Sequence, residues 1–540
     1  MLRIIFIYFI VLSNPSYSQP SPKFKPFDWV VHLSPGKINS ISEGYTYAYI
    51  ATDNGGIFRY NLYGNSFSEP ITMAQGLNSN KINSTYFDQK TGILWAASTL
   101  YLHYSFNREG GWFKIPLSNY GINKFEKILK IGSSENHIWL KTNSIHVKVE
   151  SSSGISLGLY PTPDEKNIKW SSEPYRGYDY QKKLLMDYTF MFNWSLNGEY
   201  FMNQYGQREK VTTFFNGSFN NVWAGSNKGT LFQGNKNMAT FFPLKIGINS
   251  DYVSSMYRDG SDVLLGYSNF LMGGGISTIS DRSLIRDHYD FDLTVNMSPT
   301  NIYSIYKDDN SIWAGGDGVV LYFNKSNDYW RTIGSDRGIP DENISSIVGD
   351  SSSIWIGSNQ GLRHISQYSK RVETIGFESL FNNHSINDLL INDIGLWIST
   401  KSGIFIYDKK NPQVFNAESI GYSYLDFPIS NVKLSFQDNN KIYFSCNLGV
   451  VLYDIEENSW RLVGSSELFK NKNILSLYVI NDFIFVGTNN GLYRLNHKSG
   501  ILKKYEYSFI GNIFDITSIN KIIWMATDKG LIQFNWKRDL

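Results

Sequence analysis

Short apolar stretches alternate with polar turns along this chain, and one arrangement of them recurs. Residues 343–348 contain Ile344, Ile347 and Val348, and the polar turn 349–353 follows. The apolar stretch around Trp355 comes next, then a polar turn with Gly361, then the stretch 362–366. Runs of this length bounded by Gly, Asn, Asp and Ser are typical of β-strands joined by hairpins. The pattern predicts three antiparallel strands, and a fourth after the next polar turn.

This unit recurs along nearly the whole chain. Its most constant part is a large, mostly aromatic residue within an apolar strand, followed by small residues, a polar turn and Gly. The central residues of the visible units are Tyr49, Trp95, Trp139, Trp223, Leu264, Trp313, Trp355, Trp397, Tyr443, Phe485 and Trp524. Consecutive positions are 39 to 49 residues apart, except for a step of 84 between Trp139 and Trp223. We therefore infer one further, degenerate unit within that step.

A period of roughly 40 to 45 residues with four strands is that of a propeller blade. The sequence predicts an all-β fold, a β-propeller of about twelve four-stranded blades. Because one ring usually has about four to eight blades, two rings are expected. The simplest division is a first propeller at about 19–290 and a second at 291–540.

A second series of tryptophans marks the fourth strands. Trp112, Trp330 and Trp460 each lie 17 residues after the central residue of their unit. In the last unit this position falls past Leu540, so the strand 28–32, which carries Trp29, is expected to complete that blade beside residues 531–535. One ring would then use both ends of the chain and the other would be inserted, an alternative that the sequence leaves open.

Composition agrees with a large β-protein. Phe, Tyr and Trp make up 16% of the 540 residues, and charged residues only 18%, below the roughly 25% of typical soluble domains. A disordered chain would be charged and poor in aromatics, so this class is excluded. The formal net charge is +2 without a basic block, and nucleic acid is therefore not an expected partner. We interpret the repeated tryptophans as packing between blades.

The N-terminus has the pattern of an export signal. A short basic start precedes the apolar run 4–12, and Ser16 and Ser18 supply small residues before Gln19. The apolar run is too short to cross a bilayer, which takes roughly 20 helical residues. We predict a signal peptide at 1–18, cleaved near Ser18, and a periplasmic or secreted mature chain without a membrane span. An uncleaved N-terminal anchor is the alternative.

The repeat resembles a known family. Residues 350–364 follow the pattern D-x-x-x-I-W-x-G-S-x-x-G-L-x-H, and residues 308–322 share its start, D-x-x-x-I-W-x-G, and end in Tyr322. It is similar to the two-component regulator propeller repeat, found in the extracellular sensor half of bacterial hybrid histidine kinases, commonly as two propellers. The Tyr-rich β-domain, membrane helix and kinase of those receptors are not found in this sequence.

A second likeness lies near the N-terminus. The W-x-x-H strand at Trp29–His32, followed by a propeller unit, looks like the start of the double-propeller surface component of the type IX secretion machinery. Either likeness implies a binding or assembly role. The partners implied are a separate sensor kinase or a secretion component.

The sequence carries no linear catalytic motif. Its eight histidines are scattered, and neither H-E-x-x-H, G-x-S-x-G nor a P-loop is present. The single cysteine, Cys446, excludes an intrachain disulfide and a Cys-based zinc site. Acid-rich turns such as 308–310 depart from the pattern of a calcium loop. Neither a metal, nor a cofactor, nor a catalytic residue is therefore predicted.

The best candidate for a binding site is the irregular stretch where the repeat breaks down. Aromatic rings bind sugars and peptides by stacking, and a neighbouring cation can hold a carboxylate. The predicted binding residues are Trp170, Tyr175, Arg176, Tyr178, Tyr180 and Trp194. The alternative is that these rings fill the core of the degenerate blade.

These observations predict an exported, non-catalytic propeller protein, sensor-like or scaffold, that recognises a glycan, a peptide or an envelope protein. Two alternatives remain. One is a polysaccharide lyase or glycosidase, whose catalytic residues would come from different blades and leave no linear motif. The other is an assembly factor of the envelope or of type IX secretion.

Overall fold

The computed structural model describes residues 20–540 apart from 124, 175–186, 269–273, 281–284, 290–299, 328, 383, 421–428 and 471. The predicted signal segment lies outside these residues. The fold is all-β, with eleven sheets, most of them four-stranded, among the described residues. Their strands pair antiparallel except for β16 (Thr189–Phe190) with β22 (Thr240–Lys245). This confirms the predicted class of fold.

Four sheets come from the first half of the chain. They contain β2 (Ile38–Glu43), β3 (Tyr47–Thr52), β4 (Ile57–Asn61) and β5 (Ser66–Ile71); β6 (Ile82–Phe87), β7 (Leu94–Ser98), β8 (Tyr101–Ser105) and β9 (Phe113–Pro116); β10 (Lys130–Ser133), β11 (His137–Lys141), β12 (His146–Glu150) and β13 (Ser156–Tyr160); and β19 (Arg208–Asn216), β20 (Asn221–Ser226), β21 (Thr230–Asn235) and β22 (Thr240–Lys245). We call these sheets the four-sheet group.

Seven sheets come from the remainder and form the seven-sheet group. They contain β23 (Val253–Asp259), β24 (Asp262–Tyr267), β25 (Ile276–Ser280) and β26 (Ile285–Tyr289); β27 (Ser304–Lys307), β28 (Ser311–Gly315), β29 (Val320–Asn324) and β30 (Tyr329–Ile333); β31 (Ile344–Gly349), β32 (Ser353–Ser358) and β33 (Gly361–Ser366); β34 (Ile386–Ile391), β35 (Leu396–Thr400), β36 (Gly403–Asp408) and β37 (Gln413–Asn416); β38 (Leu434–Asp438), β39 (Lys441–Cys446), β40 (Gly449–Asp454) and β41 (Ser459–Ser465); β42 (Ile474–Ile480), β43 (Phe483–Thr488), β44 (Gly491–Asn496) and β45 (Leu502–Tyr505); and β46 (Ile513–Ile519), β47 (Ile522–Thr527), β48 (Gly530–Phe534) and β1 (Trp29–His32).

Short 3-10 helices occupy several of the connections. They are η1 (Pro26–Asp28), η2 (Met73–Gln75), η3 (Leu117–Tyr120), η5 (Ser335–Arg337), η6 (Phe377–Phe381), η7 (Ala417–Ile420), η9 (Ser466–Phe469) and η10 (Trp536–Asp539). No helix among the described residues is long and apolar enough to cross a membrane.

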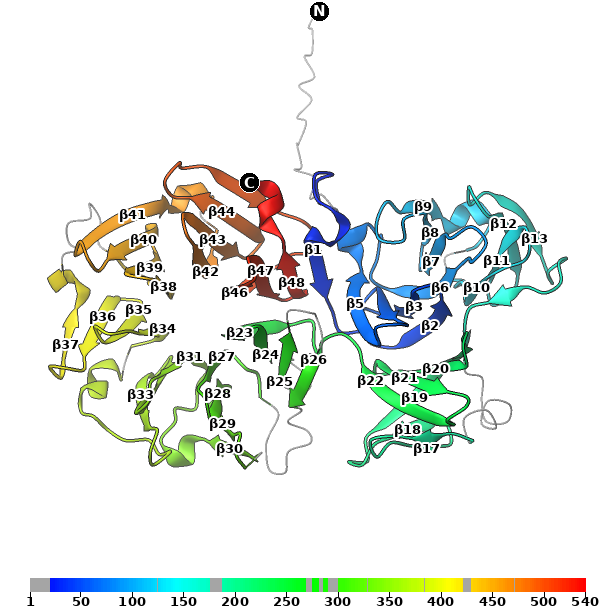
Figure 1. Ribbon diagram of the computed structural model, residues 1–540. Coiled ribbons are helices and arrows are strands. Elements are labelled where there is room, and N and C mark those ends of the chain that lie inside the picture. The colour runs from blue at the N-terminus through cyan, green and yellow to red at the C-terminus, as the bar shows by residue number, and fades with distance from the viewer. Residues whose placement is uncertain are drawn as a thin grey trace, which may run out of the picture.

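In the seven-sheet group the first strand of each sheet lies nearest the centre (Figure 1). In the seven-sheet group these strands contact one another in a closed cycle, from β23 through β27, β31, β34, β38 and β42 to β46 and back to β23. In the four-sheet group β10 contacts β6, β6 contacts β2, and β2 contacts β19.

The stretch between Trp139 and Trp223 adds strands to existing sheets rather than forming a sheet of its own among the described residues. β14 (Lys169–Trp170) pairs with β10, and β15 (Glu173–Pro174) pairs with β19. The strands β16 (Thr189–Phe190), β17 (Ser195–Asn197) and β18 (Tyr200–Met202) extend the sheet of β19–β22. The degenerate unit inferred from the sequence therefore serves as an extension of its neighbours, which leaves eleven sheets instead of about twelve.

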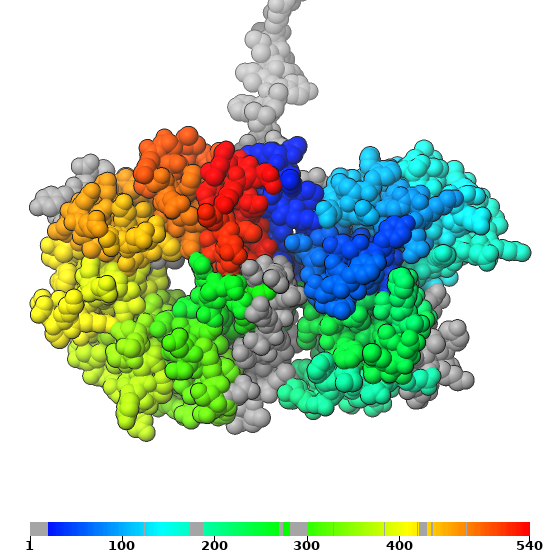
Figure 2. Space-filling view, in the orientation of Figure 1, coloured from blue at the N-terminus to red at the C-terminus, as the bar shows by residue number. Residues whose placement is uncertain are grey.

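The two ends of the chain meet in one sheet, in the pairing that the sequence predicts. β1 runs antiparallel to β48, with Trp29 opposite Phe534 and His32 opposite Leu531. The rings of Trp29 and Phe534 stack with their centroids 3.8 Å apart, and Trp29 is fully buried. Figure 2 shows the blue N-terminal residues beside the red C-terminal ones.

The repeated tryptophans are core residues. Trp95, Trp139, Trp223, Trp313, Trp355, Trp397 and Trp524 are all less than 2% exposed. Trp524, for example, packs in one cluster with Val253 and Val263 of the neighbouring sheet. The small residue that follows in the motif makes room for the next sheet, because a Cβ on Gly357 would come within 2.6 Å of Ile386.

The substitution Trp29→Ala is expected to lower the free energy of unfolding by about 3–5 kcal/mol, because it leaves a large cavity between β1 and β48. Chemical denaturation followed by circular dichroism measures this loss. Tyr368 is 99% exposed, so Tyr368→Ala serves as the control and should stay within about 0.5 kcal/mol of the wild type. Equal stability of the two variants would contradict the closing role of β1.

Candidate functional site

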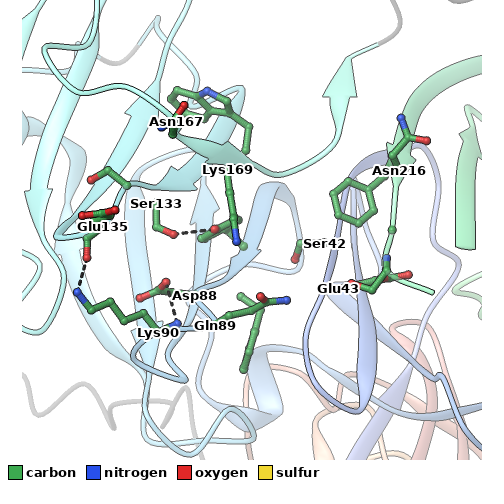
Figure 3. A pocket seen from close by; sticks show the side chains of 17 residues that line it. Ser42, Glu43, Asp88, Gln89, Lys90, Ser133, Glu135, Asn167, Lys169 and Asn216 are labelled. Atoms are coloured by element: carbon green, nitrogen blue, oxygen red, sulfur yellow. Dashed lines mark hydrogen bonds between the residues drawn. The ribbon is translucent and has the colours of Figure 1, made fainter. Parts of the chain in front are cut away.

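A cavity of about 550 Å³ opens at one end of the first strands of the four-sheet group. Its walls are the residues at which β2, β6, β10 and β19 end, together with Asn167, Lys169 and Trp170 (Figure 3). This volume falls within the roughly 300–1,000 Å³ of small-molecule sites. Two other cavities, of about 230 Å³ each, are smaller.

β14 is positioned in the cavity by its pairing with β10. Trp170 lies opposite Gly132, and Lys169 lies opposite Ser133. The indole of Trp170 rests on the backbone there, because a Cβ on Gly132 would come within 2.8 Å of Trp170 Cε3. Successive residues of a strand point to opposite faces, so Lys169 shares its face with Ser133.

The next two residues of the same segment, Ser171 and Ser172, are buried and bond the neighbouring first strands. The Ser171 amide donates to Ile131 O, and the Ser172 amide donates to Ile41 O, both at 2.9 Å. Ser172 Oγ accepts the amide of Ile41 at 2.8 Å and bonds Thr213 Oγ1 at 2.7 Å. One short segment is thus tied to β10, β2 and β19, and it fills the space between the sheets that contain β10 and β19.

The two buried carboxylates of the cavity accept hydrogen bonds from groups of the protein itself. Glu43, 5% exposed, accepts the indole N–H of Trp223 at 2.6 Å and the amide of Ser218 at 2.5 Å. Asp88, 3% exposed, accepts the hydroxyl of Thr91 at 2.6 Å and two amides of its own turn at 3.3 Å. Both carboxylates hold loops in place.

Other polar groups of the cavity remain open. Ser42 is 2% exposed, and its hydroxyl has no hydrogen-bond partner among the described residues. The ammonium of Lys169 likewise has no ion pair or hydrogen bond with a described residue. Tyr86 and Ser133 bond each other through their hydroxyls at 2.7 Å, and burial raises the pKa of Tyr86. These groups can donate hydrogen bonds to a ligand.

The structure separates the two predicted binding residues that it describes. Trp170 lines the cavity, whereas Trp194 packs on Phe232 with ring centroids 5.3 Å apart, against the apolar cluster of the sheet of β19–β22. Tyr175, Arg176, Tyr178 and Tyr180 lie outside the described residues, so their role stays a prediction.

Sequence reasoning missed Ser42, Tyr86, Ser133 and Lys169. Each is an ordinary residue at or next to a strand end, and only the convergence of the first strands brings them together. The available signal was positional: Ser42 and Tyr86 lie opposite Tyr49 and Trp95, the central residues of their units.

The centre of the seven-sheet group has a different character, because it contains two acids. Asp515 on β46 accepts the amides of Met256 and Ile516, both at 2.8 Å. Burial, with a smaller contribution from the charge of Asp388, raises the pKa of Asp515 to about 7. Asp388 on β34 accepts the hydroxyl of Ser346 at 2.9 Å. No group of three or more potential metal ligands is found in the described part of the chain.

Comparisons with known proteins show likeness in structure only. No protein-family model and no curated protein matches the chain. The extracellular domain of the hybrid two-component system BT3049 of B. thetaiotaomicron has 18% identity and a TM-score of 0.44, over 92% of this chain and 75% of that chain. The extracellular domain of BT4673 of the same organism has 14% identity and a TM-score of 0.42, over 91% and 69%.

PorZ, a surface component of the type IX secretion system of Porphyromonas gingivalis, has 12% identity and a TM-score of 0.43, over 92% of this chain and 74% of that chain. The structural neighbours thus include extracellular domains of two-component systems, the kind of protein whose repeat this sequence resembles.

The substitution Asp515→Asn is expected to flatten the dependence of stability on pH. Folded Asp515 keeps its proton up to about pH 7, whereas the unfolded side chain loses it near pH 4. The free energy of unfolding of the wild type should therefore fall between about pH 4 and pH 7, by about 1 kcal/mol or more for this group. Denaturation at several pH values measures it. Exposed Asp309 provides the control Asp309→Asn, and an unchanged slope in Asp515→Asn would refute the assignment.

The substitution Gly217→Ala tests whether the carboxylate of Glu43 is held where its two donors lie. A Cβ on Gly217 would lie 2.1 Å from Glu43 Oε1, so Gly217→Ala should displace the carboxylate from its two donors. We expect a loss of about 1–3 kcal/mol in the free energy of unfolding. Gly64→Ala is the matched control, because its Cβ would meet neighbours only at 3.4 Å and beyond. Equal stability of both variants would show that Glu43 is not held at this position.

Proposed function

We propose that the protein is an exported, non-catalytic β-propeller binding protein that takes its ligand in the cavity at the ends of β2, β6, β10 and β19. The observation that carries this proposal is the set of open polar groups, Ser42 and Lys169 above all, on a cavity of ligand size. The buried hydroxyl of Ser42 is costly unless a ligand or water satisfies it, and the exposed ammonium of Lys169 is free to bind a ligand.

We propose further that the two groups of sheets are two propellers. The cycle of contacts through β23 and β46 supports placing residues 253–289 with the second propeller. The boundary would then fall near residue 250 instead of near 290, and β1 would belong to the second propeller. The first propeller would be inserted between β1 and β23.

The state of the carboxylates supports binding over hydrolysis. A general acid or nucleophile has to be open to its substrate. Glu43 and Asp88 instead receive donors from the protein, and Glu135 lies exposed at the rim. A lyase or glycosidase therefore remains the weaker alternative.

The proposed location is the periplasm or the outside of the cell, after cleavage near Ser18. The proposed ligand is a glycan or a peptide. The proposed partner is a separate sensor kinase or a secretion component, which would respond to the ligand-bound state.

One observation favours a second role in protein assembly. The outer strands β9 and β13 expose Phe113 (51%), Leu157 (46%) and Leu159 (51%). Their sheets are neighbours, as the contacts of both strands with η3 show. Exposed apolar side chains on outer strands suit contact with another protein, as an envelope assembly factor requires.

The substitution Trp170→Ala is expected to weaken ligand binding at least about tenfold, because a large aromatic wall of the cavity is lost. A library of oligosaccharides and peptides, screened by thermal shift and followed by calorimetry, identifies the ligand and measures the affinity. Trp194→Ala is the matched control, since Trp194 lies on another surface. Unchanged binding in Trp170→Ala together with loss in Trp194→Ala would place the site elsewhere.

A further inference from the structure

Two charged side chains of the cavity, Lys169 and Glu135, have no partner among the described residues, and both residues are exposed. Glu43 and Asp88 are occupied by donors of the protein, and Lys90 bonds the backbone oxygen of Glu135. Figure 3 shows the side chain of Lys169 pointing into the cavity. A cation without a partner at a partly enclosed cavity can pair with a negatively charged ligand group.

Hydroxyl groups near Lys169 can donate hydrogen bonds to the same ligand group. Ser133 lies directly opposite Lys169, so their side chains share a face at roughly 5 Å between Cβ atoms. Of the two bonded hydroxyls of Ser133 and Tyr86, one keeps a proton for a further acceptor. Ser42 Oγ is buried without a partner on the same cavity. Three neighbouring sheets thus supply donors around one ammonium.

The remaining wall suits a ligand rich in hydroxyl groups. Gln89, Asn167, Asn216 and Ser218 line the rim, and they offer both donors and acceptors. Trp170 adds an apolar residue to the lining of the cavity, on the face of β14 opposite to that of Lys169.

From these contacts we infer that the ligand is an acidic sugar, whose carboxylate is bound by Lys169 with the hydroxyls of Ser42 and of the Tyr86–Ser133 pair. The inference rests on the proposed binding function of this cavity and specifies its ligand class.

The test compares pairs of ligands that differ only in charge. Calorimetry with the full chain uses galacturonic acid oligosaccharides against galactose oligosaccharides of equal length, and peptides with a C-terminal carboxylate against their amides. We expect the uronic acid member to bind at least about tenfold more tightly than its neutral partner, and its affinity to fall as salt is added.

Variants locate the carboxylate. Lys169→Met should weaken binding of the acidic sugar at least about tenfold and leave the melting temperature unchanged, because Lys169 has no described partner in the fold. Lys166→Met removes an equal charge from an exposed position outside the cavity and should bind like the wild type. Ser42→Ala should weaken binding several-fold.

Each outcome decides between the two levels of the proposal. Equal affinity for neutral and acidic sugars, or unchanged binding in Lys169→Met, overturns the acidic ligand and leaves the binding function standing. Binding of carboxylate peptides without acidic sugars overturns the sugar. If none of the paired sugars and peptides binds, the acidic sugar is overturned. If, in addition, the library of oligosaccharides and peptides contains no ligand whose binding is weakened by Trp170→Ala, the proposed binding function is overturned as well.

Discussion

A side-chain hydrogen bond between the first strands of neighbouring sheets is the constraint on which the rest of the structure depends. The bonds run from Ser345 to Ile386 O, from Ser304 to Ile344 O, from Thr212 to Ile38 O and from Asn39 to Ile82 O. Each joins a polar residue of one first strand to the backbone of the next. Each bond also gives a backbone carbonyl near the centre of the fold a donor, as buried polar groups require.

This spacing explains both the glycines of the motif and the tryptophans. Two first strands can approach only where the second strand carries a small residue, as Gly357 does against Ile386. The sheets diverge away from the centre, and a large ring such as that of Trp355 fills the widening gap. One polar bond, one small residue and one large residue therefore set the wedge shape of each unit.

The sequence was informative where the same physical demand is repeated. Trp355 and its counterparts recur because every unit has to fill the same gap, and Trp29 could be assigned to the last sheet because it completes a periodic series. Lys169 and Ser42 carry no such signal. They acquire their role because strands far apart in the chain end at one point, and no local pattern records that meeting. Trp194 shows the converse, since a ring in an irregular stretch here serves packing.

The pairing of β1 with β48 has a consequence for the order in which the molecule assembles. Asn535 bonds Asp28 across a separation of 507 residues, so the last sheet can be completed only after nearly all of the chain has been synthesised. The entropic cost of closing so long a loop rises only slowly with its length, but such distant contacts form late. The four-sheet group lies entirely within this loop, and its bonds span shorter separations, such as the 174 residues between Thr212 and Ile38. It can therefore fold first, and its compaction would bring β1 toward β23 and shorten the search that remains.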